Sequence, residues 1–365
     1  MNILLLSDEL MPGGVARHIV DLANSIKKRG VNVYLSTTPG EYKNRLNPEI
    51  SYLPISILIE NSFNKNYWGI IPSYIGLSKY IKKNRIDVIH THKRYSHLIG
   101  KILSKQYGIP HITSYHSDFN SEQKISIFGN ITICCSKAVC KTIVEQFGCN
   151  ENNVKTIYYG IKPFRVYNEK EKQNIVDELG IPRNKLVISS VGQFIPVKDK
   201  VSLLYSINEL KKNIDVNKIV FVLLGYGEQK KHLEYLIQKL GLKNTVIMVN
   251  GTFSVESLFN VSEFMILNSI KEGFGIVMLE AASLGKMHIG TKVGGIPEFI
   301  EDGITGKLIE AGNPEQLAKT ISFLLDNPNE YKRMGSNAKI KYEKSFGLNR
   351  MISETLNVYH SVLSK

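Results

Sequence analysis

The 365-residue sequence has little cysteine, and the spacing of that cysteine excludes a common metal-binding pattern. Cys134, Cys135, Cys140 and Cys149 are its only cysteines, and none is separated from another by the two residues of a C-x-x-C pair. A disulfide-rich secreted domain needs more cysteine than this. We therefore expect reduced thiols in a cytoplasmic protein and no zinc site built from cysteines.

Long hydrophobic runs are also absent. The longest uncharged run in the first half, residues 66–78, includes Pro72 and is well short of the roughly 20 residues that a spanning helix needs. The chain opens directly on an apolar segment, residues 2–7, without a basic region or a cleavage site, so we expect no signal peptide.

What the sequence does have is positive charge, and it lies mostly in the first half. The net charge is +13, and residues 1–165 hold 21 Lys and Arg against 11 Asp and Glu, whereas the rest holds 25 against 22. A one-sided field of this kind favours an anionic partner such as lipid headgroups, a phosphorylated carrier or nucleic acid. The alternative is a surface that is basic simply because the whole protein is rich in lysine.

Short apolar runs alternate with amphipathic segments along the first half, which predicts a doubly wound parallel sheet. The expected strands are residues 3–6, 31–36, 88–91, 111–115 and 131–134, and the expected helices are 16–29, 72–83, 96–107 and 138–147. The alternation starts again after a polar segment at 162–185, with strands expected at 185–191, 219–224, 246–249 and 264–267. A length of 365 residues also suggests two domains.

These patterns predict an N-terminal domain over residues 1–163 and a second domain over 164–344. A C-terminal helix at about 345–365 is assigned to the first domain, with Ile352, Leu356, Tyr359 and Leu363 on its buried face. Two such domains are expected to face each other across a cleft, because ligands bind at the carboxyl ends of parallel strands.

The segment at residues 269–285 combines a glycine loop, two glutamates and the start of a helix. The first N–H groups of a helix and its dipole suit a pyrophosphate, and Gly273 and Gly275 let the backbone approach closely. Glu272 and Glu280 flank this position, where carboxylates are useful if they bind neutral hydroxyls. The alternative is that Glu280 is a solvated helix residue and Glu272 a helix cap.

The E-x7-E spacing of Glu272 and Glu280 resembles the signature of family-four (group 1) glycosyltransferases, whose GT-B fold has two Rossmann-like domains facing a cleft. Six further segments resemble that family in the expected order: residues 11–33, 114–119, 156–165, 190–198, 222–236 and 294–309. The resemblance implies that the first domain binds the acceptor and the second binds the nucleotide-sugar donor.

The resemblance also implies roles for individual residues of the second domain. Glu280 would hold the ribose hydroxyls and Glu272 the hydroxyls of the donor sugar. Lys198 would neutralise the diphosphate as it leaves. The backbone N–H groups that would bind the diphosphate are those of Phe274, Gly275 and Ile276.

Two positions of this loop depart from the family. Gln193 stands where the family usually has arginine, so that Lys198 acts alone, another basic group compensates, or the activity is low or altered. Asp199 replaces a glycine that often follows the lysine.

In the first domain, the resemblance makes His116 the histidine that contacts the donor sugar, although a lone histidine is more often structural. Gly13 and Gly14 are expected to let the backbone approach the donor phosphate or the acceptor, although a Gly-Gly pair is a weak signal. Asp118 is an acceptor-side candidate that could also cap the following segment.

The function that the resemblance implies is that of a retaining hexosyltransferase, which moves a sugar from a UDP- or GDP-sugar to a hydroxyl of a glycan or lipid-linked acceptor. Polysaccharide or glycolipid synthesis at the cell surface is its expected setting. No D-x-D triplet, the usual carboxylate pair of metal-dependent sugar transfer, occurs in the chain, so we expect no metal and no cofactor.

Basic and aromatic residues mix at residues 67–85 and 92–107, next to apolar positions. Such segments suit an anionic membrane surface, which would place the protein on the inner face of the cell membrane; no nucleic acid partner is expected. The alternative is a pair of ordinary solvated helices.

The sequence gives less support to other functions. A dinucleotide-dependent oxidoreductase would need a G-x-G-x-x-G motif after the first strand, which is missing. The E-x7-E spacing argues against a nucleotide-sugar epimerase or an inverting transferase. A non-catalytic GT-B partner protein is favoured only by Gln193.

Overall fold

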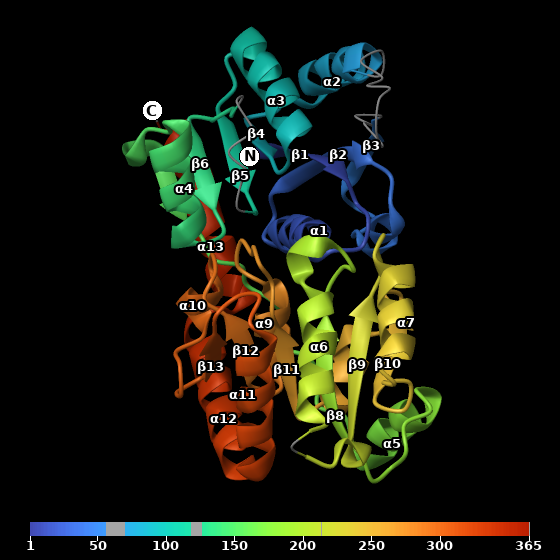
Figure 1. Cartoon of the computed structure of the whole chain (residues 1–365). Coiled ribbons are helices and arrows are strands. Elements are labelled where there is room, and N and C mark those ends of the chain that lie inside the picture. Colours follow the sequence, from blue (N-terminus) through green and yellow to red (C-terminus); the bar gives the residue numbers. More distant parts are fainter. Residues whose placement is uncertain (56–69, 118–125, 213, 365) are drawn as a thin grey trace. The chain divides into compact units, whose positions relative to one another are not determined.

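The structure is a computed structural model that describes residues 1–55, 70–117, 126–212 and 214–364. It divides into two compact units (Figure 1). Unit 1 comprises residues 1–160 and 348–365, and unit 2 comprises residues 161–347. Each unit is built on its own parallel sheet.

The sheet of unit 1 has seven strands in the order β3-β2-β1-β4-β5-β6-β7, and every pair in it is parallel. Its strands are β1 (Asn2–Glu9), β2 (Asn32–Thr38), β3 (Ser51–Pro54), β4 (Val88–Thr91), β5 (His111–Tyr115), β6 (Ile131–Cys134) and β7 (Val154–Thr156). Its helices are α1 (Gly14–Lys28), α2 (Ile70–Asn84), α3 (Arg94–Tyr107), α4 (Lys137–Phe147) and α13 (Leu348–Leu363).

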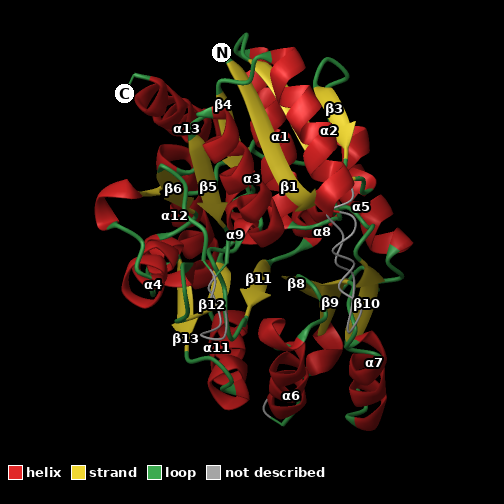
Figure 2. Cartoon of the chain, turned by 90° about the horizontal axis from the view of Figure 1, so that it is seen from above, coloured by secondary structure: helices red, strands yellow, loops and turns green. Residues whose placement is uncertain are grey.

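The core of unit 1 follows from the alternation of side chains along β1. Successive residues of a strand point to opposite faces of the sheet. Ile3 and Leu5 pack in a cluster with residues of α1 and α13, whereas Leu4 and Leu6 pack in a second cluster with residues of α2 and α3. Both faces of the sheet are therefore covered by helices (Figure 2).

Helix α13 belongs to unit 1 although it ends the chain. Ile352 and Tyr359 are buried against the sheet as expected, and Leu356 is partly buried. The expectation for Leu363 was wrong: its side chain is 42% exposed, and the buried face continues through Val362 instead. At 3.6 residues per turn, Leu363 falls one position outside the stripe that Thr355, Val358 and Val362 define.

The sheet of unit 2 has six parallel strands in the order β10-β9-β8-β11-β12-β13. They are β8 (Leu186–Val191), β9 (Ile219–Gly225), β10 (Val246–Asn250), β11 (Phe264–Leu267), β12 (His288–Thr291) and β13 (Gly306–Ile309). The helices are α5 (Glu169–Glu178), α6 (Lys200–Leu210), α7 (Lys230–Lys239), α8 (Val255–Val261), α9 (Ile276–Ser283), α10 (Ile296–Phe299), α11 (Pro314–Asp326) and α12 (Pro328–Ser345).

One face of this second sheet carries a hydrophobic core cluster of unit 2. Phe221, Phe264 and Ile266 pack there with Leu203 of α6 and Ile321 of α11. The doubly wound, Rossmann-like architecture expected for each half of the chain is confirmed. Within the described residues, no helix combines the length and the apolar character needed to cross a membrane.

Candidate functional site

Strand order places the candidate residues of unit 2 at the carboxyl ends of the two central strands of its sheet. The order reverses between β8 and β11, because the chain moves outward from β8 through β9 and then returns to β11. Loops that leave the carboxyl ends of two such strands diverge and leave a crevice, where doubly wound proteins bind ligands. Lys198 follows β8 and Glu272 follows β11, so both lie at this position.

The two loops are joined by an ion pair. Lys198 Nζ donates to Glu272 Oε2 at 2.5 Å, and both side chains are largely buried. Ser269 Oγ donates to the same carboxylate oxygen at 3.3 Å. The pair brings together two residues that the sequence predicted separately for the donor sugar and its diphosphate.

The backbone around Glu272 is fixed by close packing with a second glycine loop. Gly294 has φ +50°, and a Cβ there would lie 1.7 Å from the Glu272 carbonyl oxygen. The N–H of Gly295 donates to this oxygen at 3.3 Å, and Thr291 Oγ1 donates to the Ser269 carbonyl at 2.6 Å. Only glycine at position 294 allows this approach.

Helix α9 begins directly after this loop with no side-chain cap. Its N-cap residue, Gly275, has φ +89°, a left-handed conformation that favours glycine, and a Cβ there would lie 2.8 Å from Leu267 Cδ2. The Phe274 side chain is fully buried, 5.6 Å from the ring of Phe346. Gly273 and Ile276 are buried beside it, so this segment can offer a ligand only its backbone.

Glu280 lies inside α9 and is 3% exposed. The alternative that it is an ordinary solvated helix residue is therefore wrong. Glu272 does not cap α9 either, because its carboxylate accepts from Lys198 and Ser269. The roles of the two glutamates toward ribose and sugar stay predictions.

Gln193 and Asp199, the two departures from the family, have distinct environments. Gln193 is exposed and its Nε2 donates to the Tyr226 hydroxyl at 3.2 Å. Asp199 has φ +46°, which explains why glycine is usual here. Its carboxylate accepts from the Ser202 N–H at 3.2 Å and so caps α6, a contact that glycine could not make.

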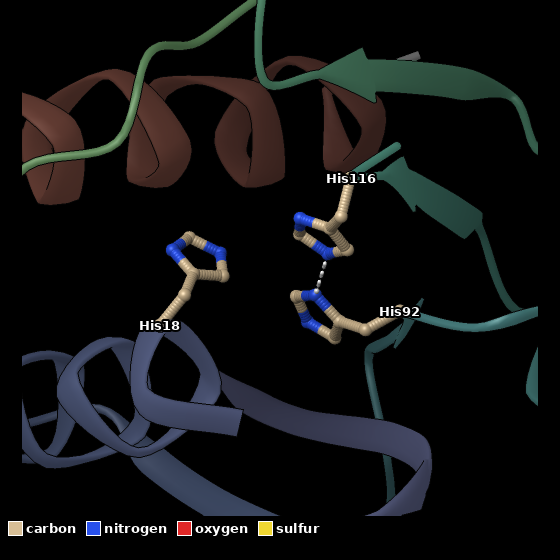
Figure 3. Close-up of side chains that lie close together, drawn as sticks. All are labelled: His18, His92 and His116. Atoms are coloured by element: carbon tan, nitrogen blue, oxygen red, sulfur yellow. Dashed lines mark hydrogen bonds between the residues drawn. The ribbon is translucent and has the colours of Figure 1, made fainter. Parts of the chain in front are cut away.

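Unit 1 contains a cluster of histidines that the sequence revealed only in part. His18 of α1, His92 after β4 and His116 after β5 point toward one another (Figure 3). His92 Nδ1 lies 3.1 Å from His116 Nε2, and His116 Nδ1 lies 2.8 Å from the Tyr159 hydroxyl. His116 therefore lies at the carboxyl end of a strand, as expected, and His18 and His92 lie beside it.

Burial keeps these rings neutral. Desolvation lowers the pKa of His18 to about 4 and the pKa values of His92 and His116 well below 6.5, and the neighbouring rings lower the latter two further. Among the described residues, His18 Nδ1 and His92 Nε2 are buried without a hydrogen-bond partner. One nitrogen from each ring lies within 4.8 Å of the others, so the cluster could hold either a polar ligand or a metal ion.

The remaining candidates of unit 1 are less constrained. Gly14 begins α1 and Gly13 is its exposed N-cap, without a side-chain hydrogen bond. A Cβ on Gly13 would meet nothing closer than 4.0 Å, so its own packing does not require glycine there. Asp118 lies outside the described residues.

A pocket of about 290 Å³ lies next to the histidine cluster, within unit 1. Its lining includes His92, Lys93, Arg94 and His116, together with Asp8. Lys93 Nζ pairs with Glu9 at 2.8 Å, and Asp8 accepts from both the N–H and the hydroxyl of Ser96. The pocket therefore combines two cations, one of them paired with Glu9, and the Asp8 carboxyl group with neutral imidazoles.

Sequence reasoning missed His18, His92 and Lys200. His18 sits inside a helix and His92 directly after a strand, and only the sheet order brings them to His116. The available signal for His92 was that it directly follows a strand, as His116 does. Lys200 is buried with its Nζ 2.6 Å from Ser190 Oγ. Its signal was a lysine two residues after the candidate phosphate lysine.

The chain matches two protein families that together span most of its length. Residues 12–165 match Glycosyltransferase Family 4, and residues 171–341 match Glycosyl transferases group 1. The chain belongs to the family-four (group 1) glycosyltransferases, as the spacing of Glu272 and Glu280 suggested.

Similar proteins come from archaea and bacteria. An uncharacterized glycosyltransferase of Methanocaldococcus jannaschii is 29% identical, over 96% of this chain and 95% of the relative. The N-acetyl-alpha-D-glucosaminyl L-malate synthase of Bacillus anthracis is 24% identical, over 94% and 92%. The crystal structure of Anabaena HepE in complex with UDP-glucose is 21% identical with a TM-score of 0.85, covering 99% of this chain and all of HepE, which shows the shared GT-B fold.

We predict that Gly294→Ala displaces the Glu272 loop, because the added methyl group would overlap the Glu272 carbonyl. Unfolding of unit 2, followed by circular dichroism in denaturant, should show a loss clearly greater than the ~1–2 kcal/mol of left-handed strain alone. Gly312→Ala is the matched control, with φ +69° and no atom within 4 Å of the added Cβ. Equal losses for the two variants would contradict the steric explanation.

Proposed function

We propose that this protein is a retaining glycosyltransferase that moves a hexose from a UDP- or GDP-sugar to an acceptor hydroxyl. The observation that carries the proposal is the Lys198–Glu272 pair beside the uncapped start of α9, at the switch point of the second sheet. A lysine and a helix N-terminus suit a diphosphate, and carboxylates suit sugar hydroxyls.

Donor binding would rearrange this pair. The diphosphate would bind to the N–H groups of Phe274, Gly275 and Ile276 and take Lys198 from Glu272. The released Glu272 carboxylate would then accept hydrogen bonds from hydroxyls of the sugar. Glu280, buried within α9, would hold the ribose hydroxyls.

The bond to be broken joins the anomeric carbon to the diphosphate. As it breaks, negative charge grows on the leaving phosphate, and a fixed ammonium at Lys198 stabilises that charge. In a retaining front-face transfer, the leaving phosphate accepts the proton of the acceptor hydroxyl, whose oxygen forms the new bond on the same face. This course is supported by the family resemblance.

UDP-sugar is the better supported donor, because HepE is described in complex with UDP-glucose. The acceptor is proposed to bind to unit 1, and a hydroxyl-bearing acceptor agrees with the Bacillus anthracis relative, a glucosaminyl malate synthase. Lys93 and Arg94 in the pocket suit an acceptor that carries an anionic group. His116, neutral and oriented by Tyr159 at Nδ1, is proposed to donate a hydrogen bond from Nε2 to the donor sugar, in place of its contact with His92.

Helix α3 supports a membrane-linked acceptor. Ile99 and Leu103 are buried against the sheet, but Leu98 and Ile102 are 40% and 43% exposed. Lys101 and Lys105 lie on the same helix. Exposed apolar side chains among lysines suit the headgroup layer of an anionic membrane. A protein bound there would act in polysaccharide or glycolipid synthesis at the inner face of the membrane. Tyr67 and Trp68, which the sequence placed in the same surface, lie outside the described residues.

The first test measures donor binding and turnover with UDP-, GDP- and ADP-sugars. Glu280→Ala should weaken nucleotide binding, and Lys198→Met should lower turnover by ~10²–10³-fold, as loss of a charge-stabilising group does. The exposed pair Lys292–Glu310, whose atoms lie 2.7 Å apart, supplies the control variant Lys292→Met, which should leave both unchanged.

Three results of this test would contradict the proposal. Absence of binding to every nucleotide sugar would favour a non-catalytic partner protein. Release of an epimerised sugar nucleotide would favour an epimerase. Unchanged binding by Glu280→Ala would remove the assigned ribose contact.

The second test concerns metal ions. We propose that transfer needs none, because Lys198 and the α9 N-terminus can together neutralise the diphosphate. Turnover should therefore be unchanged after dialysis against EDTA. A loss that Zn²⁺ restores in the wild type, but not in His18→Ala, would show instead that the histidine cluster holds a required metal.

The third test concerns the membrane. The protein should sediment with vesicles that contain anionic phosphatidylglycerol and not with neutral phosphatidylcholine vesicles. Leu98→Ser/Ile102→Ser should reduce the sedimented fraction, whereas the equally exposed Phe323→Ser of unit 2 should not. Equal sedimentation of all three proteins would contradict the assignment to α3.

A further inference from the structure

Lys200 is a buried cation that neither the family roles nor the reaction described above uses. It is the first residue of α6, and its side chain is 1% exposed. Its Nζ donates to Ser190 Oγ at 2.6 Å, and Ser190 Oγ donates in turn to the Ile266 carbonyl at 2.8 Å. Among the residues that the structure describes, no carboxylate forms an ion pair with it.

The ammonium group lies at the carboxyl end of β8, where the loop that carries Gln193 and Lys198 begins. A Cβ on Gly192 would lie 4.0 Å from Lys200 Nζ and 4.0 Å from Lys198 Cγ. The two lysines therefore both reach the turn at Gly192, one residue before Gln193. Gln193 is the position at which the family usually carries a positive charge.

A buried cation with a single hydroxyl partner is by itself energetically unfavourable. The pKa of Lys200 is lowered to about 7, mainly by desolvation and in addition by the Lys198 ammonium, while the carboxylates of Glu272 and Asp199 act in the opposite direction. An apolar side chain would fit this position at no such cost. The unfavourable charge is explained if an anion arrives nearby.

We propose that Lys200 is the second cation of the donor site, which acts alongside Lys198 and supplies the positive charge that Gln193 lacks. This inference rests on the proposed function, because it needs a diphosphate at the Gly192 loop. Lys200 is a positioning residue: it holds Ser190 and adds to the field at Lys198 without a contact of its own to the sugar.

Binding of a nucleoside diphosphate has a defined protonation consequence. The diphosphate attracts Lys198 away from Glu272 and adds negative charge near Lys200, and both changes favour the ammonium form. At pH 8 the free protein holds Lys200 mostly neutral, so binding takes up a proton from the solvent. At pH 6 Lys200 is already protonated and no uptake follows.

The experiment is calorimetric titration of the full chain with UDP and with GDP at pH 8, in Tris and in HEPES. The wild type should take up close to one proton, which appears as a dependence of the binding enthalpy on the buffer. Lys200→Met should abolish the uptake and weaken binding at least tenfold. Lys286→Met is the matched control, because burial also lowers the pKa of Lys286 at another place in unit 2, and it should behave as the wild type.

Folding and rescue measurements separate charge from structure. Lys200→Met should have a Tm at pH 7 no lower than the wild type, because it removes a buried charge. In the wild type, stability should rise from pH 7 to 10.5 because the unfolded chain holds the Lys200 proton that the folded protein has lost, and this rise should be missing in the variant. Adding Gln193→Arg to Lys200→Met should restore tight binding, since it returns the cation to the family position.

The outcomes distinguish this inference from the proposed function. A wild type that binds neither UDP nor GDP would overturn both. A wild type that binds without proton uptake at pH 8, or a Lys200→Met variant that binds as tightly as Lys286→Met, would overturn only the role of Lys200.

Discussion

The structure of the candidate donor site depends on the ion pair between Lys198 and Glu272. These side chains leave the ends of β8 and β11, the two strands between which the sheet changes direction. The Lys198 ammonium and the Glu272 carboxylate neutralise each other, and either charge alone would be partly buried and unpaired. The same contact holds the loop after β8 next to the loop after β11, and it is the contact that donor binding, as proposed, would break.

The positions of other residues around the pair follow from this constraint. Gly294 must be glycine because the Glu272 carbonyl occupies the place of its side chain. Asp199 adopts a left-handed conformation so that the chain can turn from Lys198 into α6, and its carboxylate caps that helix. Both are backbone requirements, and they fix the course of the chain beside the charged side chains.

Much of this could be predicted from the sequence, because strands buried on both faces leave a clear apolar pattern. β1, β4, β5, β6 and β11 were located to within a few residues for that reason. β7 was missed because its three residues, Val154 to Thr156, include a lysine and form an edge strand, and β12 and β13 because histidine, glycine and lysine interrupt their apolar pattern. Glu272 and Lys198 were identified because their segments resemble those of the family-four glycosyltransferases. His18 and Lys200 were not, because their importance depends on which strands are neighbours, and that information is not local in the sequence.

Helix α13 makes unit 1 depend on a segment that follows unit 2 in the sequence. Unit 2 is a continuous segment, residues 161–347, whereas the core cluster of unit 1 that holds Ile3 and Leu5 also includes residues of α13. During synthesis at about 5–20 residues per second, the N-terminal sheet leaves the ribosome first but waits for its final helix. Unit 2 has all of its residues before unit 1 does, so the order in which the two units can complete folding is the reverse of their order along the chain.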